Sequence, residues 1–577
     1  MAFQVSPGVQ VREIDLTNVV PAVSTSIGAI AGSFVWGPVN QIVQVGSEKQ
    51  LVDRFGEPND ANFKFFLSAT QFLQYASDLR VVRTNIADPQ DPDASLLANA
   101  NAGGTGTLIE NSDTFETATF EAGDEVVAKY PGALGNSIAV KFVTNETSFD
   151  ALDPDFQDQF DFVPSTTEFA AERSISGDEL HVVVYDKDGK LTGSEGTLLE
   201  TFAGLSQASN ARKSDGTNNY YRDVINDQSA YIWIGELDTT NFPEVGTNTN
   251  DTDDLVAASD GFEYTTVDTV VDYDLSGGSD GGNLASFDDL VDSYDLFADS
   301  ETVDVNLIIG PDLPEGDDEN IATQLVALAE QRRDVVVFLS PSSGRTINNV
   351  SANADVIEWA DTIGSTSYAV LDSTAVYVYD KYNDKFRWIN AAGAVAGLCA
   401  FTDNVADPWF SPAGFNRGQL RGVTKIAHNP KQAQRDSLYK ARVNPIVSFP
   451  GEGTVLYGDK TALSRPSAFD RINVRRLFIT LEKAIATAAK FQLFELNDEF
   501  TRAQFRNLVE PFLRNVQGRR GMTDFLVVCD DTNNTPEVID TNRFVADIYI
   551  KPARSINFIT LSFVAVRTGV EFSEVTG

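Results

Sequence analysis

Both ends of the chain carry segments in which apolar and polar residues alternate. Alternation with a period of two gives a strand one apolar face and a row of backbone groups that need partners. The sequence leaves open whether these strands complete a sheet of their own chain or, by strand addition, a sheet of a neighbouring copy. The alternating apolar positions are Val5, Val9 and Val11 at the N-terminus, and Val564, Val566, Val570 and Phe572 at the C-terminus.

The length of 577 residues exceeds what one hydrophobic core organises, so three or four domains are expected. The longest uncharged apolar run, residues 391–401, is too short to span a membrane. The N-terminus lacks the charged-then-apolar layout of a signal peptide, so we expect a soluble protein in a cytosol-like compartment. Cys399 and Cys529 lie in apolar runs, which favours buried thiols over a disulfide or a metal site.

The net charge of −41 is unevenly distributed along the chain. Residues 411–577 contain 23 Lys/Arg and 17 Asp/Glu, whereas the first 410 residues contain 20 and 67. Residues 88–300 alone contain 8 basic and 43 acidic residues. Such an acidic field repels nucleic acid, so no nucleic-acid partner is expected, and composition does not separate this reading from a salt-adapted surface.

The residues suited to catalysis are few. The chain has two histidines, His181 at the start of an expected strand and His428 in a polar segment, and no nucleophile motif accompanies them. The glycine-rich run 275–282 lacks the Gly-Lys-Ser/Thr of a phosphate loop and is interpreted as a turn before a helix at Phe287. Residues 186–189 fit a hairpin turn better than a calcium loop. We therefore predict no enzyme activity, cofactor or metal site.

Hydrophobic periodicity predicts a multidomain protein of mixed α/β and α+β class. Helical spacing over residues 65–76 precedes a strand at 79–84. A strand at 305–310, a helix at 319–332 and a strand at 334–341 form a βαβ unit, which implies a parallel pair. A helix at 354–363 and strands at 368–372 and 375–380 are expected to extend that sheet.

The C-terminal part is expected to be an α+β domain. Two amphipathic helices are predicted, at 475–494, with Phe491 on its apolar face, and at 499–517, where Pro511 should bend the helix or mark the start of a new segment. Three strands follow, at 524–529, 543–552 and 555–568. The predicted domains are an N-terminal arm at 1–20, an α/β core at 21–90 and 126–410, an acidic β-rich insertion at 91–125, and the C-terminal domain at 411–577 with an arm at 562–577.

The two C-terminal helices carry cations beside their apolar faces. This pattern fits either an ordinary solvated face or a docking surface for an acidic partner, and the sequence leaves both open. The cations are Arg475, Arg476, Lys483, Lys490, Arg502, Arg506 and Arg514.

Several segments, in order along nearly the whole chain, resemble contractile-tail sheath proteins of bacteriophages of the T4-like and cyanophage type. The agreement is weakest in the acidic stretches near 91–125, 145–180 and 238–274. The matching segments are PGVQVREID (7–15), VWGPVNQIVQVGSEKQLVDRFGEP (35–58), YPGALGNSIAV (130–140), NYYRDVINDQSAYIWI (219–234), LSGGSDGG (275–282), PWFSPAGFNRGQLRGV (408–423) and INVRRLFITLEKAI (472–485).

The resemblance implies a structural subunit that polymerises as stacked hexameric rings around a tail tube and contracts. It implies that arms at Val5–Ile14 and Val564–Phe572 add strands to a neighbour's sheet built from 525–529 and 544–551, and that the basic helices face the tube. Further implied partners are the baseplate and tail terminator proteins, and the implied location is the virion, with assembly in the host cytoplasm. Alternatives are the sheath of a bacteriocin or type VI system, an acidic surface-layer or adhesin protein, and an α/β enzyme built on the βαβ unit at 304–341.

Overall fold

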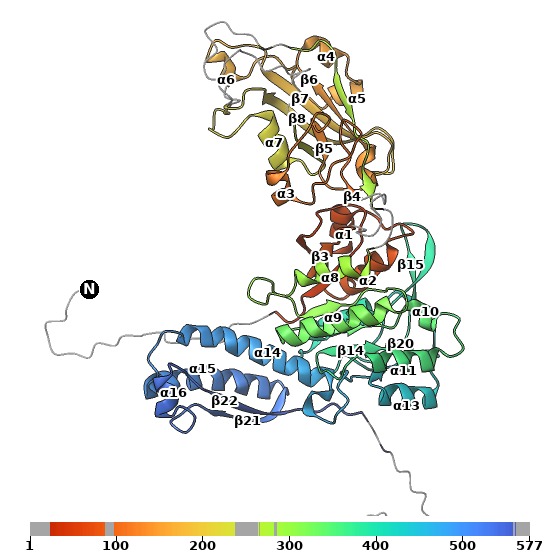
Figure 1. Ribbon diagram of the computed structural model, residues 1–577, viewed down its shortest axis with the longest axis vertical. Coiled ribbons are helices and arrows are strands. Elements are labelled where there is room, and N and C mark those ends of the chain that lie inside the picture. The colour runs from red at the N-terminus through yellow and green to blue at the C-terminus, as the bar shows by residue number, and fades with distance from the viewer. Residues whose placement is uncertain are drawn as a thin grey trace, which may run out of the picture. The chain divides into compact units, whose positions relative to one another are not determined.

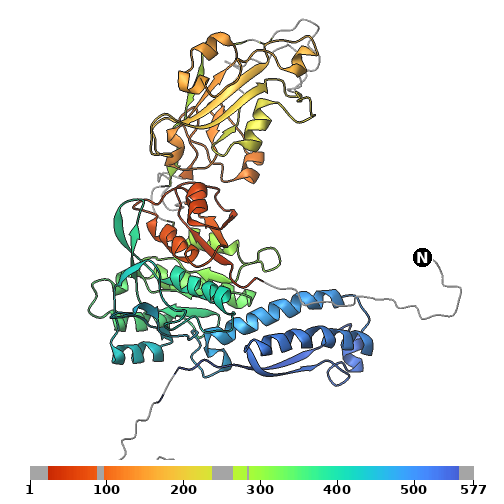
Figure 2. The same ribbon diagram turned by 180° about the vertical axis from the view of Figure 1, so that it is seen from behind.

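The computed structural model describes residues 24–86, 97–236, 264, 266–281, 285–557 and 560 (Figures 1 and 2). These residues divide into two compact units. The larger unit contains residues 24–405 and 412–466, and the smaller contains 406–411 and the chain from 467 onward.

A seven-stranded sheet forms the centre of the larger unit. Its neighbouring strands run parallel except β2, which pairs antiparallel with β3. In sheet order the strands are β18 (Val443–Asn444), β14 (Ala369–Asp372), β13 (Val336–Leu339), β12 (Leu307–Ile309), β1 (Gly28–Gly32), β3 (Leu79–Arg83) and β2 (Ile42–Val45). The central strands are fully buried, as expected for a parallel sheet covered on both faces.

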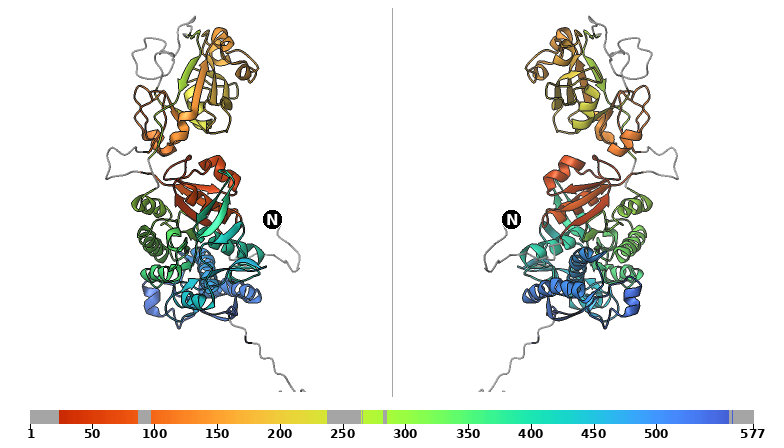
Figure 3. Two further views of the ribbon diagram at one scale, coloured as in Figure 1. Left: turned by 90° about the vertical axis from the view of Figure 1, so that its right-hand side faces the viewer. Right: turned by 90° about the vertical axis from the view of Figure 1, so that its left-hand side faces the viewer.

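Helices cover both faces of this sheet (Figure 3). On one face α8 packs against α9, and on the other α2 packs against α12. The predicted βαβ unit is confirmed, because β12 and β13 are parallel and α9 connects them. The helices of the sheet layer are α1 (Glu48–Phe55), α2 (Phe63–Leu73), α8 (Phe287–Asp295), α9 (Asp317–Arg332), α10 (Ser343–Thr346), α11 (Ala352–Thr362), α12 (Ala392–Val405) and α13 (Gln432–Lys440).

One predicted extension of the sheet is wrong. β14 joins the seven-stranded sheet, but β15 (Val376–Asp380) pairs with β16 (Lys385–Ile389) and β17 (Val423–Ile426) in a separate antiparallel sheet. The cause lies in the pattern of β15, where buried valines alternate with more exposed tyrosines, whereas a central parallel strand is apolar on both faces. A further hairpin, β19 (Ile446–Phe449) with β20 (Gly453–Leu456), follows.

Residues 97–281 form a β-rich region with its own core. Its main sheet has the order β10-β6-β7-β8, and two shorter pairs are β5–β9 and β4–β11. The strands are β4 (Leu97–Ala98), β5 (Val126–Ala128), β6 (Ile138–Val143), β7 (Glu179–Asp186), β8 (Thr197–Ser206), β9 (Ile232–Ile234), β10 (Val271–Asp274) and β11 (Ser279–Asp280). The helices are α3 (Ser112–Thr117), α4 (Glu146–Asp150), α5 (Pro154–Gln157), α6 (Glu168–Ala171) and α7 (Tyr221–Gln228).

The expected insertion at 91–125 does not stand apart from residues 126–281 where the structure describes it. Leu97 and Ala98 pair with Asp280 and Ser279, and Ala100 shares a buried cluster with Val126. Pairing between residues about 180 positions apart is set by tertiary structure, so local composition does not reveal it.

The smaller unit is an α+β fold, as predicted. It contains α14 (Ile472–Ala489), α15 (Glu499–Gly518), β21 (Met522–Val528), α16 (Pro536–Asp540) and β22 (Asp547–Pro552). The two long helices pack on each other and on the β21–β22 ribbon through Leu477, Leu481, Phe505, Val509 and Leu513 (Figure 2). α15 continues through the exposed Pro511, so no new segment starts there.

Two predictions for the C-terminal part, the start of its domain and its third strand, differ from the structure. Residues 412–466 fold with the larger unit rather than with the expected domain at 411–577, because β18 pairs with β14 and β17 pairs with β15. Residues 555–557, the start of the third expected strand, are not in a strand, and nearly all of its remainder lies outside the described residues.

Candidate assembly surfaces

The two strands that the resemblance assigns to a receiving sheet form a two-stranded antiparallel ribbon. β21 pairs with β22 from Met522↔Pro552 to Val528↔Asp547, with an irregularity after Met522. Its inner face, which includes Phe525 and Ile548, packs on the helices of the smaller unit. A two-stranded ribbon leaves backbone groups unpaired along both edges, and such edges accept further strands.

The outer face of the ribbon is partly apolar. Leu526 and Tyr549 are cross-strand partners and are 58% and 59% exposed. Lys551 Nζ lies 2.9 Å from Asp524 Oδ2 beside them. The attraction of Lys551 lowers the pKa of the exposed Asp524 carboxyl. Among the described residues no further strand pairs with either edge of the ribbon, and such edges fit strand addition.

The predicted arm positions lie outside the described residues, so the structure does not test their pairing. These positions are Val5, Val9, Val11, Ile14, Val564, Val566, Val570 and Phe572.

The seven cations predicted to face a tube do not form one exposed rim. Three of them are buried: Arg475, Arg476 and Arg502. The Arg475 guanidinium lies 4.1 Å from the centre of the Phe469 ring, and Arg502 Nη1 lies 2.9 Å from Asp531 Oδ1. The spacing of residues along a helix does not show which of its cations are covered by neighbouring elements.

The remaining four cations are accessible to different degrees. Lys483 and Arg506 are half-buried, and Lys490 and Arg514 are exposed. Arg514 Nη2 lies 3.1 Å from Glu510 Oε2, one helical turn away on the solvent side of α15. These four, rather than all seven, are available to a partner of the smaller unit.

An exposed apolar turn joins α14 to α15, and sequence reasoning missed it. α14 ends at Ala489, so Phe491 does not lie on the apolar face of that helix as predicted, and it is 73% exposed. Large apolar side chains that are exposed close together along a chain are typical of interaction surfaces. The sequence feature that could have indicated this turn is the high density of apolar residues in KFQLFELNDEF (490–500). The exposed apolar residues are Phe491, Leu493, Phe494, Leu496 and Phe500.

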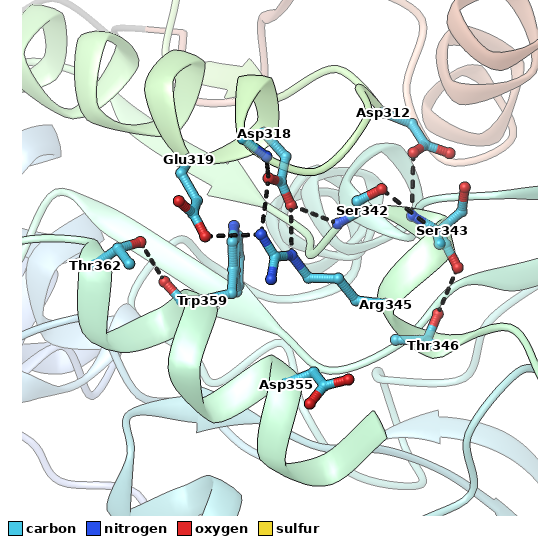
Figure 4. Close-up of polar contacts among 12 residues, drawn as sticks. Asp312, Asp318, Glu319, Ser342, Ser343, Arg345, Thr346, Asp355, Trp359 and Thr362 are labelled. Carbon is cyan, nitrogen blue, oxygen red and sulfur yellow. Dashed lines mark hydrogen bonds and ion pairs between the residues drawn. The ribbon is translucent and has the colours of Figure 1, made fainter. Parts of the chain in front are cut away.

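The charged residues at the carboxyl ends of β12 and β13 form a buried network (Figure 4). Arg345 Nε donates to Asp318 Oδ2 over 3.1 Å and Arg345 Nη2 donates to Glu319 Oε1 over 2.7 Å. The Ser342 amide also donates to Asp318, over 3.0 Å. The network links the first turn of α9 to the loop after β13, so these charged residues stabilise the fold.

Asp312 belongs to the same edge of the sheet. Burial raises the pKa of the Asp312 carboxyl, and the attraction of Lys64, whose Nζ lies 3.3 Å from Asp312 Oδ1, opposes this effect. The Ser343 amide donates to Asp312 over 3.2 Å. These contacts hold α2 and the loop after β13 at the end of β12.

The two histidines are widely separated. His181 is fully buried in β7 rather than at its edge, stacks on Phe160 and accepts a hydrogen bond from the Gly204 amide. His428 is half-buried, and burial lowers its pKa. Cys399 and Cys529 are buried and form no disulfide bond, as predicted.

The 186–189 segment begins the connection between β7 and β8, which pair as a hairpin, as predicted. Burial by itself would raise the pKa of Asp186, but hydrogen bonds from Ser137, Thr192 and Leu191 outweigh it and lower the pKa. Asp186 thus organises the turn. Within the described ranges, no cluster of His, Cys, Asp and Glu could hold a metal ion, and no helix could cross a membrane.

The described part of the glycine-rich run, residues 275–281, contains a short strand as well as turns. Ser279 and Asp280 pair with β4, and Gly277 has a φ of 80°. A Cβ at Gly278 would lie 2.5 Å from the Gly132 carbonyl oxygen, so the run is a close backbone packing site. α8 then begins at Phe287, as predicted.

Three family models match the chain. The phage tail sheath protein central domain matches residues 287–462, the phage tail sheath C-terminal domain matches 464–565, and the N-terminal region of tail sheath protein domain III matches 25–84. Their boundary near residue 463 agrees with the division between the two compact units.

Curated relatives match almost the full chain. Tail sheath proteins of Vibrio phage KVP40 and Enterobacteria phage T4 are each 34% identical, over 99% of this chain and 99% of theirs. The tail sheath protein of Salmonella phage ViI is 35% identical, over 100% of this chain and 98% of its own.

Solved structures share the fold. A sheath tail protein from Listeria innocua aligns over 92% of this chain and 96% of its own with a TM-score of 0.52 and 12% identity. The helical sheath of the anti-feeding prophage in its contracted state aligns over 98% and 99% with a TM-score of 0.50 and 12% identity. These structures show the fold, and the relatives that are at least 34% identical over nearly the whole length show that the chain belongs to the phage tail sheath protein family.

Proposed function

We propose that the chain is the structural subunit of a phage contractile tail sheath. In this role it polymerises as stacked hexameric rings around the tail tube and contracts to drive the tube through the host envelope during genome delivery. The observation that carries the proposal is the match to three phage tail sheath proteins at 34–35% identity over nearly the full chain. The role is mechanical and uses no enzyme activity or cofactor.

Strand addition links the copies in this proposal. The arms at 5–14 and 564–572 of neighbouring copies add to the open edges of the β21–β22 ribbon. The support is that the ribbon has two strands, an inner face packed on α14 and α15, and two edges that no other described strand pairs with. The donor and acceptor surfaces differ, so the contact propagates into a helical polymer instead of closing into a dimer.

Contraction then follows as a rearrangement of rigid bodies. The extended polymer is metastable, and on triggering the subunits rotate and slide so that more surface becomes buried. Main-chain strand bonds keep the copies connected, because the flanking residues absorb the rotation while the pairs stay formed.

The tail tube protein is the proposed inner partner. The accessible cations Lys483, Lys490, Arg506 and Arg514 of the smaller unit offer it a charged contact. Baseplate and tail terminator proteins are the proposed partners at the two ends of the polymer. The proposed location is the virion tail, after assembly in the host cytoplasm.

The test is removal of the N-terminal arm. Deletion of residues 1–15 should leave a folded protein that forms no cylinders in negative-stain electron microscopy, whereas the full chain forms regular hollow cylinders. A matched control replaces the same 15 residues by Gly and Ser, which keeps the length but removes the apolar face, and it should also fail to polymerise. Normal cylinders from the deletion would refute arm exchange, and dispersed particles from the full chain in every condition would refute the sheath function.

A second candidate is the sheath of a related injection system. The match to the contracted anti-feeding prophage sheath shows a shared fold, and it supports the second candidate by that shared fold alone. Purification from phage particles separates the two, because a virion carries a genome-filled head above the cylinder.

A further inference from the structure

A segment of the larger unit has a charge opposite to that of the whole chain. Residues 412–466 contain nine Lys/Arg and three Asp/Glu, whereas the 577 residues carry a net charge of −41. Residues 467–577 contain fourteen of each sign. The positive excess of the C-terminal sequence therefore lies in the segment that folds with the acidic larger unit.

One cation of this segment lies over an aromatic sheet face. Tyr377 pairs across β15 and β16 with Trp388, and Tyr379 pairs with Phe386, so all four rings share the outer face of the three-stranded sheet. Tyr379 and Phe386 are 49% and 48% exposed. Lys425 of β17 lies beside Tyr377, with its Nζ 4.4 Å from that ring centre. Such a pair is favourable in water and stronger when a partner removes the solvent.

A second aromatic group lies on the β19–β20 hairpin and holds another cation. Phe449 lies 5.5 Å from Phe415 and 5.3 Å from Tyr457, measured between ring centres. The guanidinium of Arg435, from α13, lies 5.9 Å from the centres of the Phe449 and Tyr457 rings. Lys431 is exposed at the N-cap position of α13, the helix that carries Arg435.

The elements that carry these two groups are neighbours, because β17 lies next to both β19 and β20. Lys425, Lys431 and Arg435 have no carboxylate within ion-pair distance in the part of the chain that the structure describes. Together with the two aromatic groups, these three cations form what we call the basic–aromatic face.

We propose that the basic–aromatic face docks an acidic surface of a second copy of this chain. The inference rests on the proposed function, in which copies must pack side by side. Two copies that each carry a charge of −41 repel, so a contact that places cations against acidic groups is the arrangement that avoids like charges. Aromatic residues and arginine are enriched at interface centres, where they bury large area with few rotamers lost.

The proposed contact is heterologous, because a basic face on one copy meets an acidic surface on the next. A contact of this kind repeats from copy to copy and suits a helical polymer. This contact acts together with strand exchange and fixes the orientation of neighbouring copies. A surface of cations and aromatic rings can also bind nucleic acid, so DNA binding is one outcome of the test.

The test reverses the charge of the face. In the full chain, Lys425→Glu, Lys431→Glu and Arg435→Glu are combined, and the matched control combines Lys49→Glu, Lys190→Glu and Lys213→Glu, exposed cations elsewhere in the larger unit with the same change in net charge. The protein concentration needed for cylinders, measured by sedimentation and electron microscopy, should rise about tenfold for the face variant and less than about twofold for the control. Circular dichroism and thermal unfolding should be unchanged in both, because all six side chains are at least partly exposed.

The outcomes separate the two proposals. Failure of the wild-type chain to form cylinders refutes the sheath function itself. Cylinders from wild type, control and face variant at the same concentration refute only the basic–aromatic face. Binding of a fluorescent 30-base-pair DNA by the unassembled wild type, lost in the face variant, would assign the face to nucleic acid and also overturn the proposal.

Discussion

Arg345 Nε lies 3.1 Å from Asp318 Oδ2, and the side chains of both residues are almost fully buried. The pair joins the start of α9 to the loop after β13, at the edge of the sheet where α/β enzymes bind ligands. Here the guanidinium and the carboxylate contact each other, with Glu319 as a third member. Charged residues at the position where such enzymes bind a ligand therefore stabilise the connection between β12 and β13.

This pair gives the first prediction. Arg345→Met should lower the free energy of unfolding of the larger unit by about 3–5 kcal/mol, because Asp318 is left buried without its countercharge. Urea unfolding measures the change. The double variant with Asp318→Asn should be more stable than Arg345→Met alone, and a double variant as unstable as the single one would contradict the ion-pair explanation.

The second prediction concerns pH. Asp372 is fully buried, and burial raises the pKa of its carboxyl to about 7, with opposing hydrogen bonds from Ser340 and the Thr374 amide. The folded state therefore holds a proton that the unfolded state releases near pH 4, so this group makes stability fall as pH rises from about 4 to about 7. The loss is about 4 kcal/mol at most.

Asp372→Asn removes that titration. Urea unfolding at pH 5 and pH 8 should show a smaller loss of stability with rising pH in the variant, and a variant more stable than wild type at pH 8. Equal pH dependence in both proteins would show that Asp372 titrates near its ordinary range.

The third prediction tests the close packing of α2 and α12. A Cβ at Gly393 would lie 2.2 Å from the Ser68 carbonyl oxygen, so the helices must move apart to accept alanine. Gly393→Ala should destabilise the protein by about 1–3 kcal/mol in thermal or urea unfolding. The control is Gly364→Ala, where nothing lies within 4 Å, and equal effects of both changes would refute the packing argument.

The fourth prediction concerns the turn between α14 and α15. Phe494 is fully exposed with a φ of 69°, a left-handed conformation that disfavours side chains. Phe494→Gly should raise the free energy of unfolding of the unassembled subunit by about 0.5–1 kcal/mol, because it relieves this strain. Phe505→Ala, in the buried cluster of the same unit, should instead lower it by about 3–5 kcal/mol. A loss of stability in Phe494→Gly would mean that the ring packs within the subunit.

Much of the local structure could be predicted from the sequence. The helix at 319–332, the parallel pair around it and the two helices of the smaller unit follow from periodicity, which local burial imposes on each segment. The alternation of valine and tyrosine in β15 argues against a place in the buried parallel sheet, but the strands that β15 pairs with instead are set by tertiary packing. The same holds for Phe491, since helical spacing continues past the residue at which α14 ends.

The sequence by itself determined the family, the βαβ unit around α9, the two long helices of the smaller unit and the uneven charge, since these follow from residue order and composition. Only the tertiary structure decided which cations are accessible: it buries Arg475, Arg476 and Arg502 and leaves Lys425 and Lys431 exposed. It also assigned residues 412–466 to the larger unit. The physical reason is that burial and charge placement are set by neighbours distant along the chain, which pair and pack only after the backbone has folded.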